Sequence, residues 1–128
     1  MEKYFCNYNQ SLALKELGFK KPCFGWYEHS GNFYYCYQEG LVPPSPSKKL
    51  IKNCCLAPLK SQVFEWFRDK HELVANWLYD QHDNYGSYIG VSIKNVHFEE
   101  TIVGVYKIHE EAESACIDKL IEILQHDK

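Results

Sequence analysis

The fold is decided by the stretch VANWLYDQHDNYGSYIGVSI, residues 74–93, which contains two runs suited to β-strands. In the second run isoleucine or valine occupies every other position, the pattern of a strand that is buried on one face. Residues 81–86, between the runs, are rich in Asp, Asn and Gly, which favour turns for backbone reasons. We therefore predict strands at 74–80 and 87–93, joined as a hairpin.

Three further strands are predicted outside this stretch. Two aromatic-rich runs, 23–29 and 32–38, flank Ser30-Gly31, and such runs about a short turn with glycine indicate a second hairpin. A β-branched run at 101–106 predicts a fifth strand.

The clearest helix signal lies at 8–17. Asn7 and Gln10 have the spacing of a capping box, in which each side chain bonds to the other residue's backbone N–H. Gly18 suits the position just after the helix, where the backbone adopts a positive φ that costs glycine little. The start and stop signals therefore agree on one helix.

Two more helices are predicted further along the chain. Pro58 fits the first turn of a helix that ends near Lys70, because proline needs no backbone hydrogen bond there. A last helix at about 109–125 has Glu110 and Glu111 in its first turn, where the helix dipole favours carboxylates.

Together these signals predict one α+β domain over residues 1–128. It has a mostly antiparallel sheet of about five strands and three helices in the order α-β-β-α-β-β-β-α. Residues 40–57 contain three closely spaced prolines and are expected to form a long Pro-rich loop within that domain. The helices are expected to pack on one face of the sheet through Leu12, Leu17, Val63, Phe67, Leu120 and Ile123.

Composition narrows the function classes. A net charge of −3 gives no overall attraction to phosphate backbones or anionic lipid. No apolar run is long enough for a membrane span and no signal peptide is evident, so we expect a cytoplasmic protein without membrane contact and with free thiols. A core of this size cannot hide 7 Phe, 10 Tyr and 3 Trp, so some of these rings should lie at the surface.

Most catalytic chemistries lack their sequence signals. The six cysteines and six histidines show no Cys-x-x-Cys or His-x-x-x-His spacing, so no metal and no cofactor is expected. The adjacent carboxylates Glu99-Glu100 point apart along a strand, and the spacing Gly86-x-x-x-Gly90 lacks the features of a phosphate loop. We therefore expect no catalytic residues, and the sequence favours a protein that is not an enzyme.

Three segments resemble an uncharacterised family of short proteins from phage and prophage regions of gut bacteria. They are Cys6–Phe19, Cys55–Leu59 running on to Trp66-Phe67-Arg68, and Glu110–Cys116 with Leu120–Ile123. The resemblance covers nearly the whole chain. It implies a phage or mobile-element setting and brings no assigned activity.

Three functional hypotheses follow. The favoured one is a small non-enzymatic accessory protein that binds another protein through an aromatic-rich surface. Its candidate binding residues are Tyr34, Tyr35, Tyr37, Trp77, Tyr79 and Tyr88. The first alternative is a single-stranded nucleic-acid-binding domain that uses a Tyr/Trp sheet face. The second is a thiol-dependent enzyme using Cys54 or Cys55, placed just before a predicted helix N-terminus where a thiol pKa can fall.

Overall fold

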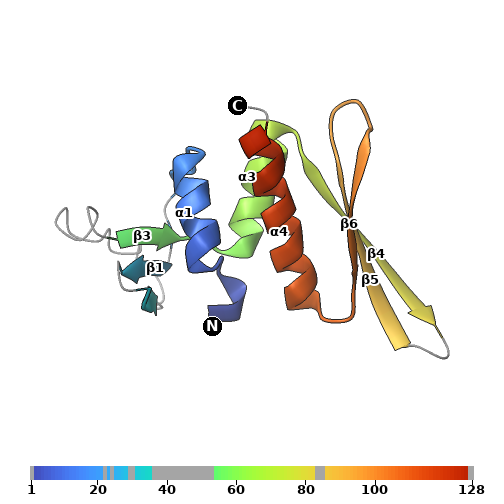
Figure 1. Ribbon diagram of the computed structural model, residues 1–128, viewed down its shortest axis with the longest axis horizontal. Coiled ribbons are helices and arrows are strands. Elements are labelled where there is room, and N and C mark those ends of the chain that lie inside the picture. The colour runs from blue at the N-terminus through green and yellow to red at the C-terminus, as the bar shows by residue number, and fades with distance from the viewer. Residues whose placement is uncertain are drawn as a thin grey trace. The chain divides into compact units, whose positions relative to one another are not determined.

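A computed structural model describes residues 2–21, 23, 25–28, 31–35, 54–82 and 86–126 (Figure 1). Its elements, in chain order, are η1 (Glu2–Tyr4), α1 (Tyr8–Glu16), β1 (Gly25–Glu28), β2 (Phe33–Tyr35), β3 (Cys54–Ala57), α3 (Lys60–His71), β4 (Val74–His82), β5 (Gly86–Lys94), β6 (Glu100–Tyr106) and α4 (His109–His126). The predicted α+β class and antiparallel strand pairing are confirmed.

The chain divides into two compact units, an N-terminal unit (Met1–Leu59) and a C-terminal unit (Lys60–Lys128). Each has its own three-stranded antiparallel sheet, with strand orders β2-β1-β3 and β4-β5-β6. The described strands therefore form two sheets where the sequence predicts one of about five strands. The prediction that all of residues 1–128 form one domain stays a prediction.

Strand β3 is the element that the sequence analysis missed, because it lies inside the predicted loop 40–57. Its residues Cys54–Ala57 pair with β1, which places Cys55 opposite Tyr27 and Ala57 opposite Gly25. A four-residue strand gains its stability from cross-strand pairing and shows too few alternations to be recognised by periodicity. Residues 40–53 of the predicted loop lie outside the described part of the chain.

Helix α1 has the ends that the sequence predicts. The Asn7 side chain accepts a hydrogen bond from the Gln10 N–H at 2.8 Å, and the Gln10 side chain accepts one from the Asn7 N–H at 3.0 Å. Gly18 has φ +98°, and the Phe19 N–H donates to the Leu14 carbonyl, which closes a Schellman ending.

The buried side of α1 differs from the prediction. Leu14 is 1% exposed, whereas Leu12 is 37% exposed. Two residues along a helix correspond to a rotation of about 200°, so these two leucines point in nearly opposite directions. Because the buried side centres on Leu14, it includes the polar residues Gln10 and Ser11.

The core of the N-terminal unit is a cluster of aromatic rings. Phe5, Tyr27 and Ala57 are buried, with Tyr8 and Phe33 packed against them. The Tyr27 hydroxyl donates to the Cys6 carbonyl at 2.8 Å, which satisfies its polar group inside the core.

In the C-terminal unit, α3 and α4 lie on one side of the β4-β5-β6 sheet (Figure 1). Val63, Phe67 and Leu120 are fully buried between these elements. Of the other predicted packing residues, Leu17 in the N-terminal unit and Ile123 here are half-buried. Helix α3 starts at Lys60, two residues after the predicted Pro58, because Leu59 forms a bridge with Phe5.

A β-bulge in β6 sets which residues face away from the helices. Val91 pairs with Gly104 and Ser92 pairs with Ile102, so Val103 is an extra residue in the ladder. Gly90, on the same face as Ser92, pairs with Val105. Ile102 and Val105 therefore lie on one face although they are three residues apart.

Candidate functional site: the helix-free face of the second sheet

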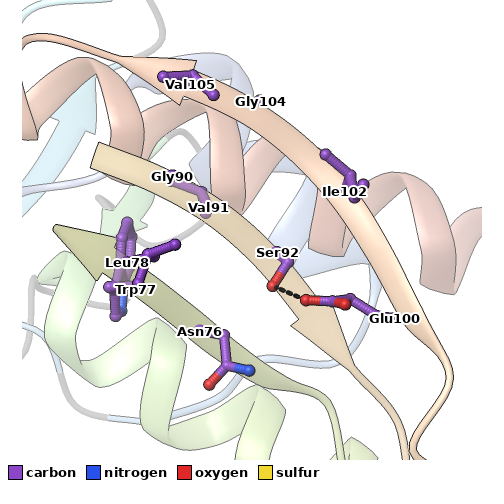
Figure 2. Close-up of a pocket in the computed structure, with 10 residues that line it drawn as sticks. All are labelled: Asn76, Trp77, Leu78, Gly90, Val91, Ser92, Glu100, Ile102, Gly104 and Val105. Carbon is purple, nitrogen blue, oxygen red and sulfur yellow. Dashed lines mark hydrogen bonds between the residues drawn. The ribbon is translucent and has the colours of Figure 1, made fainter. Parts of the chain in front are cut away.

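The face of the β4-β5-β6 sheet opposite α3 and α4 contains a shallow hollow (Figure 2). Its volume is about 430 Å³, and all three strands contribute to it. The lining residues are Asn76, Trp77, Leu78, Gly90, Val91, Ser92, Glu100, Ile102, Gly104 and Val105. We call this surface the open face.

The rim of the open face is apolar. Leu78 is 70% exposed, Ile102 is 78% exposed and Val105 is 64% exposed. A large side chain gains free energy on leaving water, about 1.5–3 kcal/mol when a leucine or isoleucine is fully buried. Three such side chains together on one sheet face are typical of a surface that another molecule covers.

Gly90 forms the floor of the hollow, between Leu78 on β4 and Val105 on β6. Its backbone is not in the positive-φ region that favours glycine. A Cβ at this position would meet only the Leu78 Cβ and carbonyl oxygen, both at 3.7 Å, an ordinary contact distance. The backbone therefore does not require glycine here, and the missing side chain leaves the centre of the strand open to close approach.

One corner of the open face is polar. The Ser92 hydroxyl donates to Glu100 Oε1 at 2.7 Å across the β5–β6 pair (Figure 2). This bond leaves Glu100 Oε2 for another donor. Within the described part of the chain, no Lys or Arg side chain forms an ion pair with Glu100. Asn76, opposite Ser92 on β4, adds an amide group to the same corner.

Of the predicted aromatic residues that the structure describes, only Trp77 is among the residues that line the hollow, and its ring points to the other face. Trp77 is half-buried and packs edge-on against Phe64 of α3 at 5.4 Å, on the helix-covered face. Tyr79 is 65% exposed and stacks on His109 with ring centres 6.4 Å apart. Tyr88 is half-buried, and the Lys107 ammonium lies 5.9 Å from the centre of its ring.

The three remaining predicted rings belong to the N-terminal unit. Tyr34 is 41% exposed and stacks on Trp26 at 6.0 Å. Tyr37 and the side chain of Tyr35 lie outside the described part of the chain. The four described rings are divided between the two units, Tyr34 in the N-terminal unit and Trp77, Tyr79 and Tyr88 in the C-terminal unit.

Apart from Trp77, the residues that line the open face are aliphatic or polar, and the aromatic content of the sequence does not point to them. Gly90 and Glu100 are visible in the sequence only within a glycine spacing and a carboxylate doublet, and both patterns were considered for other chemistry. A signal was nevertheless present, because a glycine in the middle of a predicted strand marks a bulge or a close approach.

The thiols of the described side chains, Cys6, Cys23, Cys55 and Cys116, are all buried. Cys55 lies on β3, 3% exposed, rather than before a helix, and its Sγ lies 3.6 Å from the Leu56 carbonyl oxygen. The side chain of Cys54 lies outside the described part of the chain. Burial raises the pKa of Cys23 to about 12, with a smaller contribution from Cys55. The pKa of Cys116 is also raised to about 12, mainly by burial and to a smaller extent by the nearby charge of Glu113.

The raised thiol pKa values predict a loss of stability in alkali. A folded-state pKa of about 12 against the ordinary 9.0 means that the unfolded chain releases the Cys116 proton first. The free energy of unfolding should be undiminished below pH 9 and fall as the pH rises from 9 toward 12. Urea unfolding under reducing conditions, at pH 8 to 10.5, measures this. Cys116→Ala should show a shallower decline, and an equal slope in both proteins would contradict the assignment.

No known protein family, curated protein or solved structure matches the chain. None of the helices in the described residues is both long and apolar enough to cross a membrane. The described residues also contain no group of three His, Cys, Asp or Glu side chains placed to hold a metal ion. By its fold and its candidate site, the chain is an α+β protein with an exposed, largely apolar sheet face.

Proposed function

We propose that the chain is a small non-enzymatic accessory protein that binds another protein through the open face. The observation that supports this most directly is the exposure of Leu78, Ile102 and Val105 around the hollow floored by Gly90. A partner that covers these side chains gains hydrophobic free energy without displacing α3 or α4. Sheet faces recognise partners mainly through side-chain fit, which the hollow provides.

The proposal moves the predicted binding surface from aromatic to aliphatic residues. Tyr79 and Tyr34 are exposed and stay candidates for additional contacts. We further propose a phage or mobile-element setting, as the sequence analysis expects. That setting fits a short protein whose role is to bind a partner.

Nucleic acid is a less favourable partner for this face. Residues 60–128 contain 7 Lys and Arg against 13 Asp and Glu, a net charge of −6. Phosphate backbones are repelled by such a unit, and Glu100 lies in the hollow itself. Retention of the protein on single-stranded DNA at low salt, lost by neutralising changes in the open face, would reverse this preference.

The proposed function predicts that open-face variants lose partner capture. Leu78→Thr combined with Ile102→Thr removes two apolar contacts and keeps residues that tolerate strands. In cross-linking pull-downs from an extract of the native host, the double variant should lose at least one polypeptide that the wild-type protein captures. The reason is that its partner would no longer bury apolar surface there.

A matched control is Val96→Thr, because Val96 is 51% exposed but does not line the hollow. It should capture the same polypeptides as the wild-type protein. Circular dichroism and thermal unfolding should be the same for all three proteins. Identical capture by the folded double variant and the wild-type protein would refute the open face as the binding site.

A further inference from the structure

We infer that the open face accepts an arginine side chain from its partner, with the aliphatic stem over Gly90 and the guanidinium group on Glu100. This inference rests on the proposed function, because it specifies the partner's chemistry at the same site. The expected partner is therefore a protein segment in which an arginine is flanked by apolar residues. The following observations support it in turn.

The first observation is a fixed carboxylate at the edge of an apolar hollow. Ser92 holds Glu100 Oε1 at 2.7 Å, so the carboxylate is oriented before any partner arrives. Lys94 lies opposite Glu100 on β5, but the two side chains form no ion pair, so the second oxygen can accept from a partner's donor. A preoriented acceptor loses less side-chain freedom when a donor binds, which favours association.

The second observation is the shape of the surface beside that carboxylate. Gly90 leaves the middle strand bare, with Leu78 on one side and Val105 on the other. The three methylene groups of an arginine can lie over such a floor while the charged end reaches its polar edge. A wholly apolar side chain would fill the floor but leave the Glu100 carboxylate beside it partly desolvated.

The third observation is the number and type of acceptors. Asn76 lies opposite Ser92 on β4, and Glu100 bonds to Ser92 diagonally from β6, where it stands opposite Lys94. A guanidinium group presents five N–H donors in one plane and can bond to more than one acceptor. A lysine ammonium is a more strongly hydrated point charge, so arginine fits this partly apolar corner better.

The fourth observation is the charge of the unit that contains the face. Its net charge of −6 contrasts with +3 for residues 1–59, which have 7 basic and 4 acidic residues. A second copy of the same face would bring two units of like charge together, which disfavours self-association there. A basic partner segment is attracted instead, and the attraction weakens as salt increases.

The experiment uses the full-length ¹⁵N-labelled protein and three blocked tripeptides as probes. They are acetyl-Leu-Arg-Leu-amide, its citrulline analogue, which has nearly the same shape but no charge, and its glutamate analogue. Amide resonances of Gly90, Ser92 and Ile102 report binding during titration. We expect the arginine peptide to bind about fivefold more tightly than the citrulline peptide, which corresponds to about 1 kcal/mol. The glutamate peptide should bind most weakly.

Two variants test the role of the carboxylate. Glu100→Gln should reduce the preference for arginine over citrulline to about twofold or less, because only the charge is removed. Glu99→Gln makes the same charge change at the next residue, whose carboxylate bonds to Asn95 Nδ2 at 3.2 Å. Since Glu99 does not line the hollow, this control should keep the wild-type preference.

The outcomes separate this inference from the proposed function. Equal binding of the arginine and citrulline peptides, unchanged in Glu100→Gln, would overturn the arginine assignment while leaving the open face as a binding site. Absence of shifts at all three amides would also overturn it. Failure of the proposed function is read from the capture experiment alone, where the Leu78→Thr/Ile102→Thr double variant would then behave like the wild-type protein.

Discussion

Replacing Phe67 with alanine should lower the free energy of unfolding by about 3–5 kcal/mol, the usual cost of deleting a buried phenylalanine ring. Phe67 is fully buried on α3, with the Trp66 ring at 5.0 Å and the His71 ring at 5.9 Å. Its removal leaves a cavity that these flat rings cannot fill without shifting the helix. Urea unfolding followed by tryptophan fluorescence measures the loss.

Two comparisons make this result interpretable. Phe67→Leu keeps most of the buried volume and should cost clearly less than Phe67→Ala. Leu78→Ala shortens an apolar side chain that is 70% exposed, so it should cost less than about 1 kcal/mol. A loss below about 1 kcal/mol for Phe67→Ala would contradict the packing of α3 described above.

Replacing Gly90 with valine should reduce partner binding by at least about tenfold while leaving the fold intact. The added side chain projects into the hollow, because this position faces away from the helices and its Cβ meets only Leu78 at 3.7 Å. Valine also suits the middle strand of a sheet better than glycine, so thermal unfolding should occur at the same or a higher temperature. Reduced binding would then not be a consequence of unfolding.

The measurement compares Gly90→Val with the wild-type protein in the tripeptide titration and in the capture experiment. The matched control is Val96→Thr, which changes an exposed residue outside the hollow. A stably folded Gly90→Val protein that binds both the arginine peptide and the captured partner as the wild type does would show that the hollow is not used. A lower unfolding temperature would instead contradict the view that this position tolerates a side chain.

The helices could be predicted because their signals are local. Asn7, Gln10 and Gly18 form the predicted cap contacts within one or two turns of the same helix. The strands of the second sheet were also predicted closely, since Ile89, Val91 and Ile93 repeat every two residues and all three are buried. In both cases neighbours in sequence are neighbours in space.

The division into two sheets could not be predicted in the same way. Strand β3 pairs with β1 across the 25 residues that separate the two strands, and only that pairing makes Cys54–Ala57 a strand. Leu12 was misassigned for a related reason, because a helix that buries Gln10 and Ser11 has a weak apolar stripe. Which side of such a helix is covered depends on the element packed against it.

The sequence by itself determined the α+β class, the caps of α1 and the buried alternation of β5, because these depend on contacts between residues close along the chain. The tertiary structure decided which sheet face stays uncovered and which side chains share it. Ile102 and Val105 are three residues apart and would point to opposite faces of a regular strand. The extra residue Val103 brings them to the same face beside Gly90, since a bulge shifts the register of one strand against its partner.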